Sequence, residues 1–504
     1  MNSPRKPISR GRVAAAVAVA ALVAVAAFVV YESYLAPPSV QSDCVSVQAG
    51  TVVRSQVSNR TFGAITEFAL PGNDTWPSAI TTGPDGSVWF VEQAVPGVAN
   101  LFPNNGTLVQ YSWPGYKAPT EAGCFPTVSS SGIALWDGRV WGADEFGDVI
   151  YGINPTDGSV TTINSTGKGN YPYWLAPGPD GNLWVSFDDT PAELGRIFPN
   201  GTMSTIDLVG TGEDSPLQID FVNSSLAFLD TINLSTNSTT QGCVCNGHIY
   251  SFDPSNVGST LTPTMVGAGY ELIEPTSVTY SQGRIWVAQH YSSSVVSYDF
   301  QSNSWTKYPT SLVPWTNTTL PLFIAANGSD IWFNEHYANK IALIRPASGT
   351  LTEVSESDPP ASTYTGIQND EYIAMAGSRV WFTSMTGNYV GYIEAGYGQT
   401  FGINATTDGT TVTPGGNATL DLKVTGTWAG DLKVGVSDSE GYFSIPTKIL
   451  VTPSVLEIPS GTSAYDLSVG IQVSQAASAG EYTIAVTVTD GGIQQSAYFY
   501  ITVT

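Results

Sequence analysis

The sequence predicts an all-β protein: a ring of seven repeated four-stranded units and a smaller β-sandwich, behind one N-terminal membrane-spanning helix. Three observations lead to this prediction. An apolar run lies near the N-terminus, a Trp-centred phrase recurs up to about residue 395, and residues 400–504 alternate apolar and polar positions. The composition agrees, because 51 Gly, 32 Pro and only 12% charged residues describe a chain rich in turns.

The N-terminal segment combines positive charge with a long apolar run. Residues 1–12 form a basic segment that holds four of the 18 Lys and Arg, and the 18 residues Val13–Val30 are all apolar. Such a run is just long enough to span a membrane, and the positive flank stays in the cytoplasm. We expect an uncleaved single-pass signal anchor over residues 13–31 in the cell membrane, with a cleaved signal peptide as the alternative. Residues 32–61 are then an extracellular linker.

The remaining composition suits an exported chain. Its 42 acidic against 18 basic residues give a net charge of -24, which repels phosphate backbones, so no nucleic-acid partner is expected. Twelve Asn-x-Ser/Thr sequons are glycosylation candidates, with chance sequons as the alternative: Asn59, Asn73, Asn105, Asn164, Asn200, Asn223, Asn233, Asn237, Asn317, Asn327, Asn404 and Asn417. The four cysteines, Cys44, Cys124, Cys243 and Cys245, would be oxidised outside the cell and allow three connectivities. Because Cys243 and Cys245 are too close for an easy mutual bridge, we expect at least one to pair with Cys44 or Cys124.

The Trp phrase marks the repeated units. It has the form Gly-x-Val-Trp-Phe, with tryptophans at Trp89, Trp141, Trp184, Trp286, Trp332 and Trp381 and a degenerate copy at Ala227, spaced 43 to 59 residues apart. Repeats of this length with several short strands are typical of β-propellers. We expect residues 62–396 to form a seven-bladed β-propeller in which each Trp packs one blade on the next. Ala64–Pro71 reads as a fourth strand before the first complete unit, and we expect it to complete the last blade.

The C-terminal segment has a different pattern. Period-two alternation in Ala418–Val424, Tyr465–Ile471, Tyr482–Val488 and Ala497–Val503 is broken by Gly-rich turns. About seven short strands of this kind over residues 400–504 predict an immunoglobulin-like β-sandwich without an inter-sheet disulfide.

Three phrases resemble the streptogramin (virginiamycin B) lyase family: Ile65–Pro71, Gly83–Glu92 and Trp332–His336, followed by Asn339-Lys340-Ile341. The resemblance covers roughly residues 62 to 396 and implies a seven-bladed propeller. For active lyases it also implies a Glu-Pro-His-Gly phrase, whose His is the general acid or base, and two Glu that hold magnesium. Glu92 and Glu335 match the position three residues after a Trp.

The implied catalytic His has no counterpart at its position. Glu274-Pro275 keeps the opening of the phrase, but Thr276 stands where the His belongs. The other units hold Ser78, Ser131, Tyr173, Leu217, Leu322 and Glu371 there, and the three histidines of the chain, His248, His290 and His336, stand elsewhere. The sequence therefore does not support the proton transfer of the lyases.

Charged residues follow the Trp strands, where one face of a propeller gathers its loops. These positions carry Glu92, Asp144, Glu145, Asp188, Asp230, His290, Glu335 and His336. They are expected either to bind a divalent cation such as Mg²⁺ or Ca²⁺, or a cationic ligand, or to form a solvated acidic rim. The best trio is Glu335, His336 and His290, on neighbouring units. Glu92, Glu274 and Glu335 are the candidate metal ligands, His290 and His336 the candidate catalytic groups, and Asp144, Glu145, Asp188 and Asp230 the candidate ligand rim.

Two classes of function follow as hypotheses. The first is a membrane-anchored extracellular binding module for a cell-surface protein, a polysaccharide or a cation. The alternative is a metal-dependent, streptogramin lyase-like C–O lyase or lactone hydrolase. A structural role in a cell-surface layer is a third possibility, and the fold alone does not choose among them.

Overall fold

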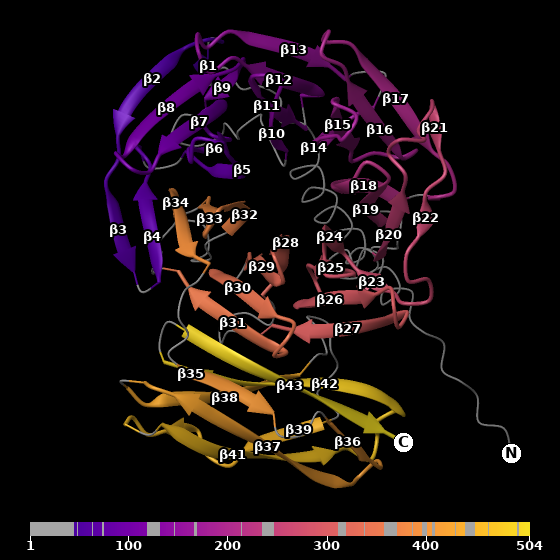
Figure 1. Ribbon diagram of the computed structural model, residues 1–504. Helices are drawn as coiled ribbons and strands as arrows, with labels where there is room; N and C mark the ends of the chain where they lie inside the picture. Colours follow the sequence, from indigo (N-terminus) through magenta and orange to yellow (C-terminus); the bar gives the residue numbers. More distant parts are fainter. Residues whose placement is uncertain are drawn as a thin grey trace, which may run out of the picture.

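Within the residues that the computed structural model describes, every regular element is a β-strand (Figure 1). The structure describes residues 45–504 except 48, 63, 73–74, 118–131, 146, 166–168, 213, 234–245, 311–318, 337, 357–369, 386, 396–400, 406–408, 429, 439–448, 462 and 491–492. Within these residues no helix is long and apolar enough to cross a membrane. The segments expected at 1–12 and 13–31 lie outside the described residues, as do Cys44, Cys124, Cys243 and Cys245.

Seven sheets, called blades 1 to 7, are each built on an antiparallel meander and follow one another around a propeller-like ring (Figure 1). Blade 1 contains β5 (Pro77–Thr82), β6 (Val88–Glu92), β7 (Gly97–Phe102) and β8 (Thr107–Ser112), with β2 (Val52–Gln56) added outside. Blade 2 contains β10 (Ile133–Trp136), β11 (Arg139–Asp144), β12 (Val149–Ile153) and β13 (Val160–Asn164). Blade 3 contains β14 (Pro172–Pro177), β15 (Leu183–Phe187), β16 (Glu193–Ile197) and β17 (Met203–Leu208), with β21 (Thr260–Leu261) outside.

The other four blades repeat this meander. Blade 4 contains β18 (Asp214–Asn223), β19 (Leu226–Asn233), β20 (Asn246–Phe252) and β22 (Thr264–Met265), and β23 (Leu272–Ile273) also pairs with β20. Blade 5 contains β24 (Pro275–Ser281), β25 (Arg284–Gln289), β26 (Ser294–Asp299) and β27 (Ser304–Pro309). Blade 6 contains β28 (Pro321–Asn327), β29 (Asp330–Glu335), β30 (Lys340–Arg345) and β31 (Thr350–Ser355). Blade 7 contains β32 (Asp370–Ala376), β33 (Arg379–Ser384), β34 (Tyr389–Glu394), β4 (Ile65–Ala69) and β3 (Asn59–Phe62).

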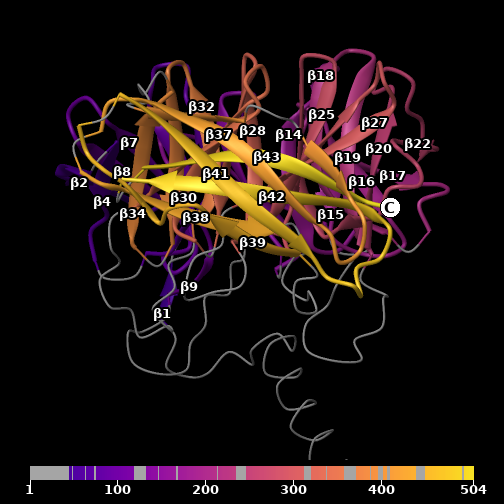
Figure 2. The ribbon, with the colours of Figure 1, turned by 90° about the horizontal axis from the view of Figure 1, so that it is seen from below.

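The chain closes the ring as its sequence predicts. Strand β4 pairs antiparallel with β34, from Tyr389 opposite Ala69 to Ile393 opposite Ile65. Phe68 of β4 is 1% exposed and packs against Trp381 at 6.0 Å between ring centroids. Outside the ring, β1 (Val45–Val47) and β9 (Gly115–Lys117) form a ribbon that projects from one face (Figure 2).

The repeated tryptophans are packing residues. All six are at most 5% exposed: Trp89, Trp141, Trp184, Trp286, Trp332 and Trp381. Each lies in a second strand, where period-two alternation turns it towards the apolar space beside its blade. The prediction of their role is therefore confirmed.

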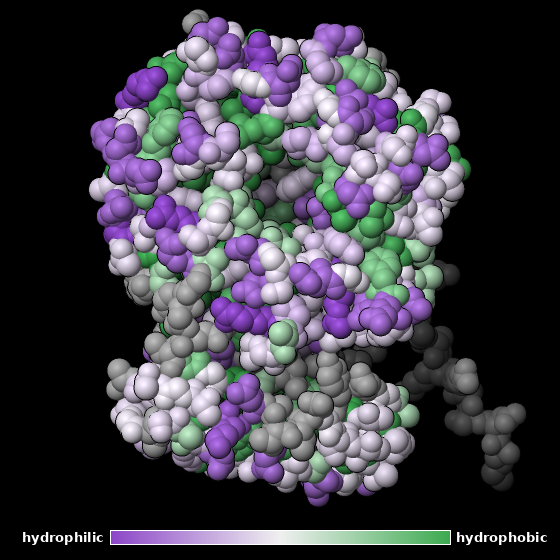
Figure 3. Space-filling view, in the orientation of Figure 1, coloured by the Kyte–Doolittle hydropathy of each residue, from purple (hydrophilic) through white to green (hydrophobic). Residues whose placement is uncertain are grey.

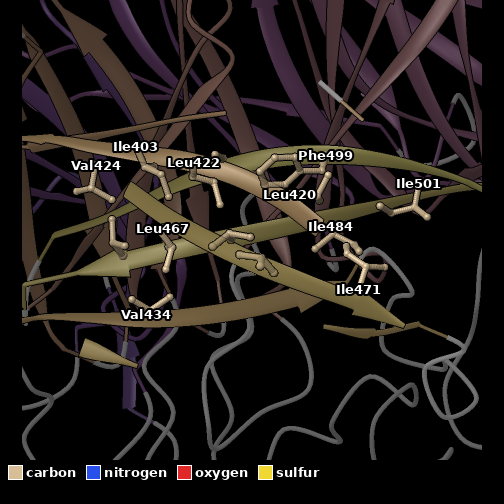
Figure 4. Packing of buried hydrophobic residues seen from close by; sticks show 14 of the residues in the cluster. Ile403, Leu420, Leu422, Val424, Val434, Leu467, Ile471, Ile484, Phe499 and Ile501 are labelled. Atoms are coloured by element: carbon tan, nitrogen blue, oxygen red, sulfur yellow. The ribbon is translucent and has the colours of Figure 1, made fainter. Parts of the chain in front are cut away.

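The C-terminal strands form two packed sheets. One contains β35 (Phe401–Ala405), β37 (Asn417–Gly426), β41 (Ala464–Val473) and β39 (Ile449–Pro453). The other contains β43 (Ile493–Val503), β42 (Gly480–Thr489), β38 (Leu432–Asp438) and β40 (Glu457–Ile458), with β36 (Gly409–Val412) parallel to β43. Alternate residues such as Ile403, Leu420, Leu467, Ile484 and Phe499 fill the space between the sheets (Figure 4). The alternation therefore predicted a sandwich correctly.

One strand pairing that the sequence did not predict joins the sandwich to the ring. β43 pairs antiparallel with β31 of blade 6, from Leu351 opposite Ser496 to Val354 opposite Ile493. The Thr352 hydroxyl donates a 3.2 Å hydrogen bond to Gln495 Oε1, and both residues are buried. The outermost strand of a blade has one edge of backbone N–H and C=O groups without a partner strand. In β31, β43 of the sandwich pairs with this edge. The two units therefore share one continuous sheet.

Candidate functional site

A repeated backbone feature brings particular side chains together at one face of the ring. In blades 1, 3, 5 and 6 the innermost strand begins with Pro, and the preceding residue has a positive φ of 46° to 55°: Trp76, Tyr171, Glu274 and Leu320. Its carbonyl accepts a hydrogen bond from the residue that follows the second strand, at 2.9–3.0 Å: Gln93, Asp188, His290 and His336. A non-glycine residue in this conformation is strained unless its surroundings hold it. The start of the innermost strand is thereby fixed to the end of the second.

Blade 5 places a carboxyl and an imidazole at these two positions. His290 Nδ1 lies 3.1 Å from Glu274 Oε2, and their side chains are 14% and 15% exposed. On blade 6, His336 lies beside them, with its ring centroid 5.7 Å from that of His290. We call Glu274, His290 and His336 the histidine cluster. It brings together both candidate catalytic groups, His290 and His336, and one candidate metal ligand, Glu274.

Burial determines the charge of this pair. It raises the pKa of Glu274 to about 8 and lowers the pKa of His290 to about 4. At neutral pH the proton therefore lies on the carboxyl, which donates to Nδ1 of a neutral imidazole and leaves the hydrogen of His290 on Nε2. This Nε2 is buried and has no hydrogen-bond partner among the described protein atoms. An unpaired buried N–H typically costs about 1–3 kcal/mol, so a ligand acceptor here would be stabilised.

Glu335 does not join the two histidines. It is 0% exposed in the interior of blade 6, where Lys340 Nζ lies 3.9 Å from Glu335 Oε2 and 3.8 Å from Glu353 Oε1. Burial and the nearby Glu353 charge raise the pKa of Glu335 well above its usual value. The expected trio of Glu335, His336 and His290 is therefore wrong in one residue. The carboxyl beside the two histidines belongs to Glu274 and not to Glu335.

The other expected metal ligand is also a packing residue. Glu92 is 1% exposed, and Gln110 Nε2 donates to both of its carboxylate oxygens, at 3.0 and 2.8 Å. Within the described residues no group of three or more His, Cys, Asp or Glu is arranged to hold a metal ion.

The expected acidic rim is largely interior. Asp144 is 5% exposed and accepts from the Gly147 N–H at 3.0 Å, and burial raises its pKa to about 7. Asp230 is 0% exposed and accepts from the Gln218 N–H at 2.9 Å, and burial raises its pKa well above the usual value. Asp188 accepts from Ser215 Oγ at 2.5 Å, while Glu145 is half-buried. A solvated rim is therefore the wrong description for Asp144 and Asp230.

Thr276, at the position of the implied catalytic His, is part of the framework. It is 6% exposed, and its hydroxyl donates a 2.7 Å hydrogen bond to the Leu322 carbonyl. Ser78 is 0% exposed and Leu217 4%, while Tyr173 and Leu322 are half-buried. Ser131 and the side chain of Glu371 lie outside the described residues.

His248 belongs to a separate cluster in blade 4. Its Nδ1 lies 2.7 Å from Asp214 Oδ2, which also accepts from Thr231 Oγ1 and Tyr250 OH. The hydrogen bond to Asp214 raises the pKa of His248. Although burial alone would raise the pKa of Asp214, the hydrogen bonds and the charge of His248 lower it. The pair is a structural ion pair that anchors the start of β18.

The centre of the ring holds an aromatic stack that the sequence analysis missed. Trp174 of β14 stacks on Phe323 of β28 at 5.6 Å, and Phe323 stacks on Tyr372 of β32 at 4.0 Å. These rings come from the innermost strands of three blades. Trp174 and Phe323 stand two residues after Pro172 and Pro321, where the strand register shifts. An aromatic residue two positions after the Pro that begins an innermost strand was the sequence signal that could have predicted this stack.

Several sequons have a structural role in turns. Asn105, Asn200 and Asn223 each accept, through Oδ1, a hydrogen bond from the backbone N–H two residues later. Asp85 and Asp253 make the same contact in other turns. Asn and Asp favour such turns for this reason. Sequons at these positions therefore do not by themselves indicate glycosylation, although the three Asn side chains are exposed.

Comparison with known proteins finds similar folds at low identity. No protein-family model and no curated protein matches the chain. A solved streptogramin B lyase is 20% identical over 65% of this chain and 96% of its own, with a TM-score of 0.48. A PQQ-bound aldose sugar dehydrogenase from Streptomyces coelicolor is 13% identical over 57% of this chain and 94% of its own, with a TM-score of 0.33. The ring architecture follows from this chain's own strand pairing, and no activity follows from these likenesses.

Proposed function

We propose that the chain is a membrane-anchored extracellular binding protein, in which the ring and an immunoglobulin-like sandwich present a ligand-binding surface. The observation that carries this proposal is Thr276. A general acid or base must exchange a proton near the working pH, and a threonine hydroxyl does not. This hydroxyl is also engaged by the Leu322 carbonyl. The proposed anchor at residues 13–31 and the extracellular location rest on the sequence.

The burial of Glu92 and Glu335 supports the same proposal. Both carboxyls contact groups of their own blades, Gln110 and Lys340 respectively. A metal-assisted elimination needs carboxylates that face the substrate. The scaffold is therefore proposed to bind a surface protein, a polysaccharide or a cationic ligand and to leave that ligand chemically unchanged.

The test combines turnover with binding. Full-length chain in detergent micelles is incubated with a cyclic depsipeptide lactone, with and without Mg²⁺, and is also used to capture ligands from a surface extract. We expect no ring opening and specific capture. Lactone opening that depends on Mg²⁺ would overturn the proposal, and so would an absence of any captured ligand above a heat-denatured control.

A lyase or lactone hydrolase is the second candidate, and one observation favours it. His290 has a buried, unpartnered Nε2 and an orienting carboxyl at Nδ1. The Nε2–H of a neutral, oriented imidazole could donate to an oxygen that gains negative charge in such a reaction. Should the chain open a lactone, His290→Ala is expected to abolish the reaction and Thr276→Val to leave it unchanged.

A further inference from the structure

A connected row of aromatic rings crosses the boundary of blades 4 and 5. We call it the aromatic ridge; in contact order it contains Tyr280, Phe228, Phe300, Tyr298, Trp305 and Tyr270. Successive ring centroids lie 5.7, 5.8, 5.1, 5.1 and 4.9 Å apart. Tyr280 lies near the end of β24, whereas Glu274 precedes its start. Tyr280 and Glu274 therefore lie at opposite ends of β24, whereas Tyr270, at the other end of the ridge, contacts Gln289, the neighbour of His290.

Most of the ridge reaches solvent. Phe300 is 41% exposed, and Tyr270, Tyr280, Tyr298 and Trp305 are half-buried, whereas Phe228 is 1% exposed and supports the row from below. Phe300 stands in the turn between β26 and β27. On the face viewed in Figure 3, apolar side chains gather over β18 to β20 and border hydrophilic ones over β26 and β27.

Hydrogen-bonding groups without net charge accompany the rings. Tyr298 OH donates to Asn303 Oδ1 at 3.2 Å, and Gln301, Ser302 and Ser304 are exposed in the same turn. The two charged side chains beside them neutralise each other, since Arg284 Nη2 lies 2.8 Å from Asp299 Oδ2. The surface thus offers aromatic faces, amides and hydroxyls in one place.

This combination matches the chemistry of a neutral sugar. A pyranose has an apolar face of C–H groups, which packs on an aromatic ring, and a rim of hydroxyls, which needs both donors and acceptors. A cationic ligand is disfavoured beside Phe300, because the Asp299 carboxylate of this turn is paired with Arg284. An anionic polymer is disfavoured by the net charge of -24. Several aromatic rings in a row suit an oligosaccharide or polysaccharide better than a single sugar.

We propose that the aromatic ridge is a binding site for a neutral polysaccharide. The inference rests on the proposed binding function and names the class of ligand and the place where it binds. Phe300, Tyr298 and Trp305 stack on successive sugar rings, and Asn303 and Gln301 bond to their hydroxyls. The ligand is bound and released unchanged, with no bond made or broken.

The experiment titrates the full-length chain in detergent micelles with maltohexaose, cellohexaose and chitohexaose. Calorimetry gives the affinity. We expect at least one oligosaccharide to bind and Phe300→Ser to weaken that binding at least about tenfold. Val209→Ser is the matched control, because Val209 is an apolar residue that is 48% exposed outside the ridge. Its affinity should equal that of the unmodified chain.

Each outcome decides a different point. If none of the three oligosaccharides binds, or if Phe300→Ser binds as well as Val209→Ser, the ridge is not a polysaccharide site. Capture from a surface extract that persists in Phe300→Ser would then leave the binding function standing elsewhere on the molecule. A protein ligand that is lost in Phe300→Ser would overturn the sugar class. Tyr298→Phe keeps the ring and removes the hydroxyl, so a smaller loss is expected.

Discussion

Single residues show that a carboxyl in the second strand of a blade can be buried whichever face of the strand it occupies. Glu92 and Glu335 are the last residues of β6 and β29, and these strands are buried on both faces, since Val91 and Asn334 are also 0% exposed. Alternation identifies the two faces of a strand but not which of them the rest of the protein covers. The sequence pattern therefore did not indicate the burial of these two carboxyls.

The histidines allow the electrostatics of the site to be measured. We expect His290 to stay neutral from about pH 8 down to near pH 4, because burial lowers its pKa to about 4. We expect the pKa of His248 to lie above the ordinary value of an imidazole, because the hydrogen bond to Asp214 stabilises its protonated form. Imidazole nitrogen shifts of labelled protein provide the measurement, since the chain has three His.

Two variants control this titration. Asp214→Asn should lower the pKa of His248, whereas Glu274→Gln should leave His290 neutral, because burial alone holds its pKa low. A His290 that titrates near the pKa of a free imidazole would mean that the cluster is open to water.

Among the elements, local pattern predicts much more than long-range pairing does. The Trp strands, the turns and the closing strand β4 follow from periodicity and from Gly-Pro-Asp-Gly sequences, which act over a few residues. The pairing of β43 with β31 joins Ile493 to Val354. It depends on which exposed edge meets which strand, and no local pattern carries that information.

The closing strand should contribute strongly to the stability of the ring. Phe68→Ala removes a side chain that is 1% exposed and packed on Trp381 and Tyr392. We expect a loss of about 3–5 kcal/mol in the free energy of unfolding, measured in urea. Val53→Ala on β2, 49% exposed, is the control and should change it by less than about 0.5 kcal/mol. Equal effects of the two changes would contradict the closure of blade 7 by β4.

The shared sheet should couple the sandwich to the ring. Gln495→Ala removes a buried acceptor of the Thr352 hydroxyl and is expected to cost about 1–3 kcal/mol. Because β43 pairs with strands of both the ring and the sandwich, calorimetry of the variant should show ring and sandwich melting together, at a lower temperature than in the unmodified chain. Gln475→Ala, an exposed change in the sandwich, should leave both unchanged. Two separate transitions, of which only one shifts, would show that the units are independent.

At the scale of the whole molecule, buried carboxyls determine the pH dependence of stability. Burial raises the pKa of Asp220 to about 6, of Asp144 to about 7 and of Glu274 to about 8, and it raises those of Asp230 and Glu335 well above the usual range. Each of these groups binds its proton more tightly in the folded state. Its contribution is therefore fully present below the unfolded pKa, near 4, and is lost as the pH rises through the folded pKa.

His290 opposes this trend over part of the range, because its pKa falls to about 4 and folding then gains stability as the pH rises towards 6.5. The buried carboxyls outnumber this one imidazole, so we expect the free energy of unfolding to be highest near pH 4 and to fall from pH 5 to pH 8. Urea unfolding at several pH values measures this curve. Asp230→Asn should reduce the slope by up to about 1.4 kcal/mol per pH unit, since it removes one proton from the balance. Glu394→Gln, whose carboxyl has a pKa lowered by Arg379, should leave the slope unchanged between these values. Stability that rises from pH 5 to pH 8 would show that these carboxyls are hydrated in the folded protein.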